Sequence, residues 1–298
     1  MGKRELLKMS FEDKVQRSKE LILEWYLQYR GKVYVSFSGG KDSAVLLHLC
    51  RSIKGCENVP GVFSDTGLEY PEIRQFVKKQ ENIIWIKPKM TFKEVIEKYG
   101  WPVVSKEVAQ KISEIRNTGS EKLRNKRLYG DEKGNGRLPA KWLPMVNAPF
   151  KITSKCCNIM KKNVFAKFEK ESGLKPILGV MATESKLRMT KFLKGNCNAF
   201  NSPHPKSEPL SFWTEDDVWE YIRRYNVEIC EVYTKYGLKR TGCMFCMFGC
   251  HLGGDKRFEI MRQNWPVQYA YIMDKLGGRA VFDEYMRIAH LENKNRVE

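Results

Sequence analysis

Small, hydroxyl-bearing and charged residues are concentrated in one short stretch near the start of the chain, at 36–43. An apolar, β-branched run precedes this stretch at 33–35, and a helical run follows it at 44–49. This order predicts a strand, a tight loop and a helix, which brings backbone N–H groups and a helix N-terminus to one point. Adjacent glycines let the backbone approach an anion closely, and Lys41 adds a positive charge. The pattern predicts a phosphate site, with an ordinary glycine-rich turn as the alternative.

A second group of reactive side chains consists of cysteines, of which the chain has nine. Cys156 and Cys157 are adjacent, and Cys243 and Cys246 have the spacing of a hairpin that binds one metal or cluster. Nine thiols in a chain without an evident secretion signal indicate thiol or metal chemistry rather than disulfides. Three alternatives stay open: tetrahedral zinc, a redox dithiol at the hairpin, and an iron–sulfur cluster, which accepts adjacent thiolates more readily than zinc does.

Polar residues also follow two further apolar segments, 61–67 and 175–181, which are predicted to be buried strands. Because ligands of doubly wound sheets bind at the carboxyl ends of parallel strands, these residues could face a nucleotide, its metal, or a phosphate or sulfate group. A simple Asp-Thr-Gly turn is the alternative for the first segment. The candidate residues at these strand ends are Asp65, Thr66, Gly179, Glu184, Ser185 and Arg188.

Other predicted elements form the framework that positions these groups. Residues 10–30 are predicted to form an amphipathic helix, 83–86 a buried strand, and a further helix is predicted to begin after Thr214. The polar, basic stretch 117–141 is predicted to be a mobile loop or small insertion, either a solvated loop or a lid or nucleic-acid contact. This alternation predicts the α/β class, with a doubly wound, mostly parallel sheet and helices on both faces.

Three ranges are expected along the chain: an N-terminal helix at 1–30, a nucleotide-binding α/β domain at 31–210, and a smaller helical C-terminal lobe with the cysteine hairpin at 211–298. The net charge of +18, from 53 Lys and Arg against 35 Asp and Glu, favours a nucleic acid partner over a generally basic surface or a site for a highly charged nucleotide. No apolar run is long enough for a membrane span, so a cytoplasmic protein without a membrane partner is expected, as a monomer or an oligomer.

The loop Ser36-Phe-Ser-Gly-Gly-Lys-Asp-Ser43 resembles the pyrophosphate-binding loop (PP-loop) of the ATP pyrophosphatases. That superfamily includes the phosphoadenosine phosphosulfate reductases and the tRNA thiolation enzymes. The resemblance implies an adenine nucleotide α-hydrolase-like fold, with ATP or another adenylyl nucleotide bound over the loop. The loop residues that it assigns to nucleotide binding are Ser36, Phe37, Ser38, Gly39, Gly40, Lys41, Asp42 and Ser43.

A more specific resemblance comes from the cysteines and the segment between them. Over residues 33 to about 250, the chain is similar to the cluster-bearing adenylylsulfate reductases. The similarity lies in three features, in this order: the adjacent cysteine pair, the segment Trp213-x-x-x-Asp-Val-Trp-x-Tyr-Ile222, and the motif Gly-Cys-x-x-Cys. The resemblance implies that the four cysteines named above ligate a 4Fe-4S cluster, with zinc as the alternative. Reductases of this group carry a C-terminal Glu-Cys-Gly-Leu-His segment whose cysteine attacks sulfur, whereas no cysteine follows Cys250 here. Cys250 and Cys197 are then the candidate reactive thiols.

The resemblance and the basic charge together imply an ATP pyrophosphatase of sulfurtransferase type, which adenylylates an acceptor oxygen so that sulfur can replace it. The acceptor is expected to be nucleic acid, through DNA phosphorothioation or tRNA thiolation, with ATP, Mg²⁺ and a cysteine desulfurase or other sulfur donor. The alternatives are an adenylylsulfate or phosphoadenylylsulfate reductase, with its nucleophile from Cys250 or in trans, and a non-catalytic, cluster-bearing subunit that binds nucleic acid. The expected catalytic residues are Lys41, Asp42, Asp65, Arg188 and Cys250.

Overall fold

The structure is a computed structural model and describes residues 2–252 and 254–294. The chain forms two compact units, each assembled from segments that are far apart in the sequence. The first unit comprises the chain up to Asp65, Glu69–Lys87 and Val164–Thr241, and the second comprises Thr66–Leu68, Pro88–Asn163 and the chain from Gly242 onward. The ranges expected from the sequence, with boundaries at 30/31 and 210/211, do not coincide with these units.

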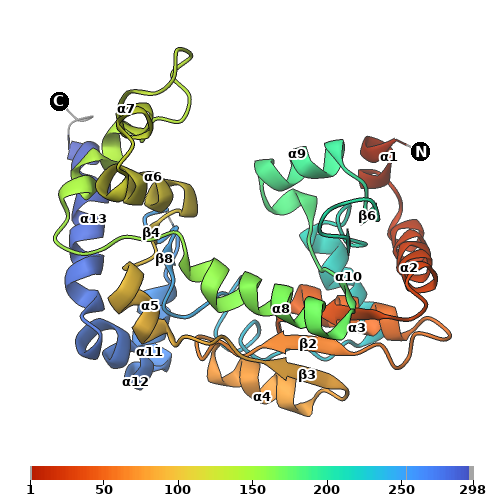
Figure 1. Cartoon of the computed structure of the whole chain (residues 1–298). Helices are drawn as coiled ribbons and strands as arrows, with labels where there is room; N and C mark the ends of the chain where they lie inside the picture. The colour runs from red at the N-terminus through yellow and green to blue at the C-terminus, as the bar shows by residue number, and fades with distance from the viewer. Residues whose placement is uncertain (1, 253, 295–298) are drawn as a thin grey trace. The chain divides into compact units, whose positions relative to one another are not determined.

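A six-stranded sheet forms the centre of the first unit, in the order β3-β2-β1-β5-β7-β6. Its neighbouring strands are parallel, except that β6 is antiparallel to β7. The mostly parallel sheet with flanking helices confirms the predicted α/β class (Figure 1). The strands are β1 (Val33–Ser36), β2 (Gly61–Ser64), β3 (Ile83–Ile86), β5 (Lys175–Ile177), β6 (Asn198–Ala199) and β7 (Lys206–Ser207).

Helices cover both faces of this sheet. They are α1 (Lys3–Leu7), α2 (Phe11–Gln28), α3 (Lys41–Arg51), α4 (Pro71–Lys79), α8 (Asn163–Ser172), η3 (Ala182–Glu184), α9 (Lys186–Lys194) and α10 (Glu215–Tyr225). The rule that crossovers between parallel strands are right-handed predicts α3 and α4 on one face and α8 on the other. The Tyr34 ring of β1 accordingly stacks on Phe165 of α8 and meets Phe168 edge-on. Val33 and Val35 point to the opposite face and are buried.

Two helices of the first unit begin where their sequences predict. Ser10 caps α2 by accepting a hydrogen bond from the Asp13 amide at 3.1 Å, and Thr214 forms a capping box with Asp217 at the start of α10. Each cap contributes about 1 kcal/mol. The buried Lys14 of α2 pairs with Asp217 at 2.7 Å. This ion pair ties α10, which carries Glu215 in its first turn, to α2.

Helices dominate the second unit, with a two-stranded parallel sheet among them. β4 (Val103–Val104) pairs with β8 (Met247–Phe248), which directly follows the Cys-x-x-Cys hairpin, so the sheet anchors the hairpin to a distant part of the chain. Within the described part of the chain, no helix is long and apolar enough to cross a membrane. The helices are α5 (Phe92–Tyr99), α6 (Lys106–Asn117), α7 (Glu121–Tyr129), η1 (Ala140–Asn147), η2 (Asn158–Lys162), α11 (Arg257–Asn264), α12 (Pro266–Ala270), η4 (Tyr271–Lys275) and α13 (Gly278–Lys294).

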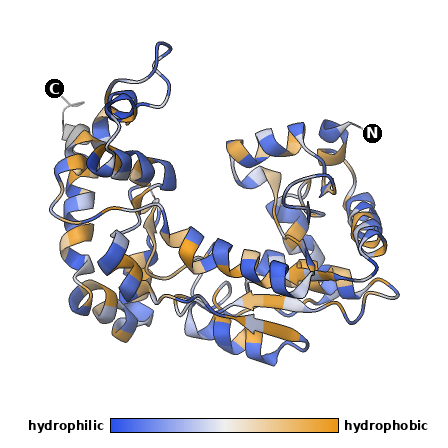
Figure 2. Ribbon diagram, viewed as in Figure 1, coloured by the Kyte–Doolittle hydropathy of each residue, from blue (hydrophilic) through white to orange (hydrophobic). Residues whose placement is uncertain are grey.

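The helix α7 lies within the stretch 117–141, for which the sequence predicts a mobile loop or a small insertion. A loop over the whole stretch is wrong, whereas a small insertion is compatible with this helix. Gly130, with φ of +95°, ends the helix. No residue of α7 is buried, and hydrophilic residues dominate it (Figure 2). Arg127 holds it to α6 through an ion pair with Glu114. A helix without an apolar stripe escapes a search for apolar periodicity, which is why the sequence pattern did not indicate it.

Candidate functional site

The nucleotide loop predicted at 36–43 is a compact turn between β1 and α3 that is held by its own hydrogen bonds. The Ser38 backbone N–H donates to the Ser43 hydroxyl at 3.1 Å, and that hydroxyl donates to the Gly40 carbonyl at 2.7 Å. Gly39 has φ of +73°, and a Cβ there would lie 2.8 Å from a side chain of α4, so the turn requires glycine. The loop is therefore held in its turn by hydrogen bonds among its own residues and by the glycine at 39.

This loop lies where the strand order of the sheet reverses, because connections lead from β1 to β2 on one side and from β5 to β6 and β7 on the other. Such a reversal is where doubly wound sheets bind ligands. Gly179, just after β5, approaches α3 so closely that a Cβ would lie 3.2 Å from the Asp42 carbonyl oxygen. Ser36 ends β1 at the same edge, whereas Phe37 is buried and its ring lies 6.2 Å from that of Phe76. The structure thus brings Ser36 and Gly179 to the loop and gives Phe37 a packing role.

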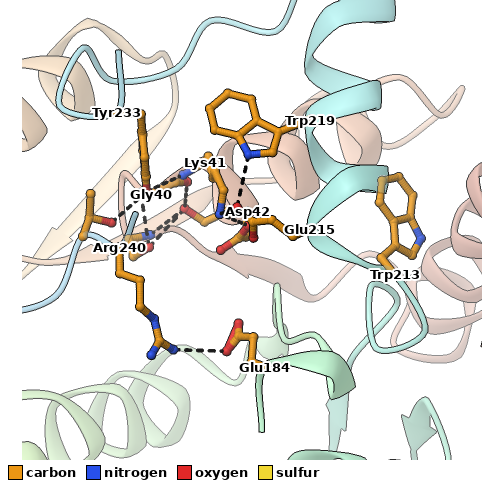
Figure 3. A network of polar contacts seen from close by, with 12 residues as sticks. Gly40, Lys41, Asp42, Glu184, Trp213, Glu215, Trp219, Tyr233 and Arg240 are labelled. Carbon is orange, nitrogen blue, oxygen red and sulfur yellow. Dashed lines mark hydrogen bonds and ion pairs between the residues drawn. The ribbon is translucent and has the colours of Figure 1, made fainter. Parts of the chain in front are cut away.

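Lys41 is a buried cation, with 4% of its surface exposed. Its ammonium lies 3.0 Å from the Asp42 carboxylate and 3.1 Å from that of Glu215 on α10 (Figure 3). Burial by itself lowers the pKa of Lys41, but the two carboxylates outweigh burial and raise that pKa above its ordinary value. The Trp219 indole N–H donates to the Glu215 carboxylate at 3.1 Å. Lys41 therefore stays charged, and an incoming anion must compete for it with two carboxylates.

Asp65 and Thr66, which the sequence predicts as one site, belong to different units. Asp65 is buried, and its carboxylate accepts a hydrogen bond from the Arg74 guanidinium of α4 at 2.9 Å. A metal or nucleotide at Asp65 would share the carboxylate with this arginine. The Thr66 hydroxyl, in the second unit, accepts from the Leu68 amide at 3.2 Å.

Glu184, Ser185 and Arg188 lie together at the start of α9. The Ser185 hydroxyl accepts a hydrogen bond from the Arg188 amide at 3.2 Å and so caps the helix. The Glu184 carboxylate pairs with the Arg188 guanidinium. It also lies 3.6 Å from the Arg240 guanidinium (Figure 3). This group therefore brings three charged side chains to the end of the segment that follows β5.

Four residues beside the predicted site are not indicated by the sequence: Glu215, Tyr233, Arg240 and Thr241. The Tyr233 hydroxyl accepts a hydrogen bond from the Lys41 backbone N–H at 3.0 Å. Arg240 and Thr241 come directly before the Gly-Cys-x-x-Cys segment, and this position is the signal that could have indicated them. Tyr233 has no comparable signal, because 192 positions separate it from Lys41.

Local structure positions the four predicted metal ligands, all of which lie in the second unit. Cys156 and Cys157 begin the helical segment that continues through the π-helical turn η2 into α8. In the hairpin, the Cys246 N–H donates to the Cys243 carbonyl at 3.1 Å, which makes a tight turn. The Leu68 carbonyl accepts from the N–H of the next hairpin residue, Met244, at 2.7 Å and anchors the turn.

These four thiols are close enough to repel one another as thiolates. Burial, followed by repulsion from Cys243, Cys157 and Cys246, raises the pKa of Cys156, and burial is the main cause that raises the pKa of Cys246 to about 11. Four neighbouring soft donors have the chemistry of a metal–sulfur centre, and a cation would stabilise their thiolates. Among residues 2–252 and 254–294, however, no three His, Cys, Asp or Glu side chains are arranged to hold a metal ion.

The two candidate reactive thiols are buried and lie in different units. Cys250 lies 3.7 Å from the Cys246 carbonyl oxygen, and burial raises its pKa to about 12 although Arg257 opposes the shift. Cys197 lies 3.5 Å from the Lys3 ammonium and 3.3 Å from the Ser211 hydroxyl. Buried, protonated thiols are poor nucleophiles, so the environment of Cys250 does not favour direct attack on a ligand.

A family model for the phosphoadenosine phosphosulfate reductase domain matches residues 32–248, which include the loop and all four predicted metal ligands. The chain therefore belongs to this family, within the PP-loop superfamily that the loop sequence resembles.

Two similar proteins differ in how much of their length this chain matches. An adenosine 5′-phosphosulfate reductase of Staphylococcus haemolyticus is 26% identical over 237 residues, which cover 76% of this chain and 74% of that protein. An uncharacterised protein of Methanocaldococcus jannaschii is 26% identical over 239 residues, which cover 78% of this chain and 46% of the relative. This chain thus spans about half the length of that relative. Among solved structures, a phosphoadenylyl-sulfate reductase of Candida auris in a phosphate complex aligns with a TM-score of 0.44 and 18% identity, over 76% of this chain and 87% of that one.

Proposed function

We propose that this chain is a PP-loop enzyme that uses ATP to adenylylate an oxygen of a nucleic acid and so prepares that oxygen for replacement by sulfur. One observation carries the proposal: where the sheet reverses its strand order, a compact glycine-containing loop presents Lys41 and the N-terminus of α3 beside Gly179. A polyphosphate fits this arrangement, because backbone N–H groups, the helix dipole and an ammonium all favour anionic oxygens. Asp42 and Glu215 keep that ammonium charged.

In the proposed reaction, the acceptor oxygen attacks the α-phosphorus of ATP. A bond forms between this oxygen and phosphorus, the bond to the bridging oxygen breaks, and pyrophosphate leaves with the electron pair. Lys41 and the N–H groups of α3 hold the leaving pyrophosphate and offset its charge, and Arg188 approaches the α-phosphoryl oxygens. Asp65 would hold Mg²⁺, which supplies further charge neutralisation when bound. A sulfur nucleophile then displaces AMP from the adenylylated acceptor.

The replacement of the acceptor oxygen by sulfur is proposed to depend on the cysteines of the second unit. The four predicted ligands would hold a 4Fe-4S cluster, or zinc in the alternative, and a cluster supplies sulfur or electron chemistry when bound. A cysteine desulfurase or another persulfide donor is the proposed source of sulfur. Cys250 and Cys197 would carry a persulfide only after their surroundings open, because both thiols are buried.

A nucleic acid is the proposed acceptor because of the charge of the chain and the placement of its lysines. The net charge is +18. In the unit that holds the loop, Lys186, Lys191 and Lys194 of α9 are all exposed, and this helix begins beside Glu184. Exposed cations on one helix suit the regularly spaced phosphates of a nucleic acid. The arginines of α7, by contrast, are hydrogen-bonded within the second unit, which makes the stretch 117–141 the weaker candidate.

Pyrophosphate release from ATP is the measurement that tests this function. The chain is purified anaerobically and incubated with ATP, Mg²⁺ and a panel of DNA and tRNA molecules. Release that one nucleic acid stimulates, and that Lys41→Ala abolishes, supports the proposal. Salt-sensitive binding of nucleic acid without turnover would instead indicate a non-catalytic binding subunit.

The second candidate is an adenylylsulfate or phosphoadenylylsulfate reductase, which the name of the Staphylococcus haemolyticus relative favours. In that reaction a thiolate attacks the sulfate sulfur, the bond from sulfur to the bridging oxygen breaks and the adenosine phosphate leaves. A second thiol then forms a disulfide and releases sulfite. Because Cys250 is buried and its pKa is about 12, the nucleophile would have to come in trans. Sulfite release from adenylylsulfate with a thiol reductant would favour this candidate over the first.

A further inference from the structure

The segment between α10 and the cysteine hairpin contacts the nucleotide loop directly. We call residues 231–241 of this segment the strap. Near its start, Tyr233 is buried, and its hydroxyl accepts a hydrogen bond from the Lys41 backbone N–H at 3.0 Å (Figure 3). At its end, the Thr241 hydroxyl lies 3.0 Å from that tyrosine hydroxyl. A Cβ on Gly40 would lie 2.7 Å from the Thr241 hydroxyl oxygen and 3.1 Å from that of Tyr233. Two strap hydroxyls therefore meet the loop at Gly40.

The Lys41 backbone N–H, which donates to the Tyr233 hydroxyl, is the kind of donor that binds phosphate. Since α3 begins at Lys41, this N–H has no acceptor within its own helix. Such groups bind anionic oxygens, and the helix dipole strengthens the interaction. The Lys41 ammonium also lies 5.6 Å from the centre of the Tyr233 ring. The Tyr233 oxygen thus lies at a point of the loop where an oxygen of a bound phosphate is expected.

Both strap hydroxyls can donate to an anion. Each has one O–H group that rotates and two lone pairs, and either can be the donor in the bond that joins them. Burial raises the pKa of Tyr233, so its phenol keeps the proton. Trp219 meets the Tyr233 ring edge-on, with ring centres 6.3 Å apart. A phosphate oxygen that replaced the Tyr233 oxygen as the acceptor of the Lys41 N–H, with the Tyr233 side chain shifted aside, would accept hydrogen bonds from that N–H and from both hydroxyls.

We propose that Tyr233 and Thr241 are ligands of the nucleotide's phosphate chain, so that the strap completes the anion site that the loop begins. The inference rests on the proposed function, since it requires a polyphosphate at the loop. The cations of the site are already paired, Lys41 with two carboxylates and Arg240 with Glu184. Hydrogen bonds from neutral donors therefore take a larger share of phosphate recognition than they would beside unpaired cations.

Inorganic pyrophosphate with Mg²⁺ is the probe for this inference, and isothermal titration of the full chain measures its Kd. Tyr233→Phe and Thr241→Val each remove one hydroxyl and keep the shape of the side chain. Each change is expected to weaken pyrophosphate binding about tenfold, because a hydrogen bond to a charged oxygen is lost. Thr241→Ser keeps the hydroxyl and should restore the affinity of the unchanged chain.

The strap offers matched controls of the same residue types. The Tyr236 hydroxyl donates to the Glu72 carboxylate at 3.2 Å, and the Thr234 hydroxyl donates to the Glu231 carbonyl at 3.3 Å. Tyr236→Phe and Thr234→Val should therefore leave pyrophosphate affinity unchanged. Circular dichroism and thermal unfolding identify any variant that is misfolded or destabilised.

The outcomes separate this inference from the function on which it rests. Unchanged pyrophosphate affinity in folded Tyr233→Phe and Thr241→Val would overturn the inference and leave the proposed function standing. Tighter binding in these variants would also overturn it, because the strap would then obstruct the loop. If the unchanged chain binds neither pyrophosphate nor ATP, the proposed function fails and the inference fails with it.

Discussion

The two units hold polar centres that differ in how their charges are balanced. In the first unit, Lys41 lies between the carboxylates of Asp42 and Glu215, whose effect on its pKa outweighs that of burial. In the second unit, burial and the repulsion of neighbouring thiolates act in the same direction and raise the pKa of Cys156. One centre therefore combines opposite charges, whereas the other gathers groups that acquire like charges when they ionise.

This difference indicates which centre needs a bound cation before its groups can ionise. Opposite charges attract, so the carboxylates of Asp42 and Glu215 favour the ionised form of Lys41. Neighbouring thiols resist ionising together, so we expect these cysteines to become thiolates only where a cation binds them. The predictions below test this contrast, beginning with the largest expected effect.

Loss of the proposed cluster is the largest effect. Chain purified anaerobically should hold about four irons, and Cys156→Ser or Cys243→Ser should lose them, because a cluster bound through four thiolates does not survive the loss of one. Iron and sulfide analysis and the visible spectrum measure this. Cys50→Ser and Cys230→Ser, in the first unit, are the controls and should keep the iron. A colourless chain with one zinc would contradict the cluster, although the thiolates would still depend on a metal.

Lys41→Ala tests the centre of the first unit, in which Lys41 is paired with two carboxylates. The change should weaken pyrophosphate binding on the order of 100-fold, because it removes a cation from the anion site and leaves two carboxylates facing it. Titration calorimetry measures the affinity, with the exposed Lys54→Ala of the same unit as control. Iron content should stay unchanged. A parallel loss of iron would show that the two centres are not independent, and the contrast would have to be abandoned.

Surface lysines extend the comparison to nucleic acid binding. Lys191→Ala with Lys194→Ala, in the last turn of α9, should weaken nucleic acid binding about tenfold and lower the salt slope by about two, since each phosphate contact contributes about one. The matched pair on α7, Lys122→Ala with Lys126→Ala, should have a smaller effect. Fluorescence anisotropy over a salt series measures both. An equal or larger effect of the α7 pair would move the proposed interface to the second unit.

The smallest effect concerns an isolated thiol of the first unit. Burial raises the pKa of Cys230 from 9.0 to about 11. The unfolded chain ionises this thiol first, so the free energy of unfolding should fall as the pH rises through this range, by roughly 1–2 kcal/mol. Urea unfolding at several pH values measures the slope, which Cys230→Ala should reduce. An unchanged slope in the variant would show that burial of a single thiol is not what penalises its ionisation.

Local signals account for the parts of the fold that the sequence predicts well. The strand 83–86 coincides with β3, although β3 lies at the edge of the sheet and none of its residues is buried, contrary to the prediction of a buried strand. Ser10 and Thr214 cap the helices that they were predicted to cap. These signals act over a few residues and need no tertiary context. The helix within 117–141 was missed because α7 is stabilised by arginine contacts to its neighbours, which leave no periodic apolar pattern in the sequence.

The sequence by itself determined the strand–loop–helix that carries Lys41, and the cysteine spacing that indicates a metal centre, because both depend on neighbours along the chain. Only the tertiary structure decided what surrounds them. Glu215 and Tyr233 reach Lys41 from almost the other end of the first unit's sequence, and no local pattern specifies such a partner. Folding likewise assigned Asp65 and Thr66 to different units. Long-range packing chooses these contacts, and it depends on the whole chain rather than on any one segment.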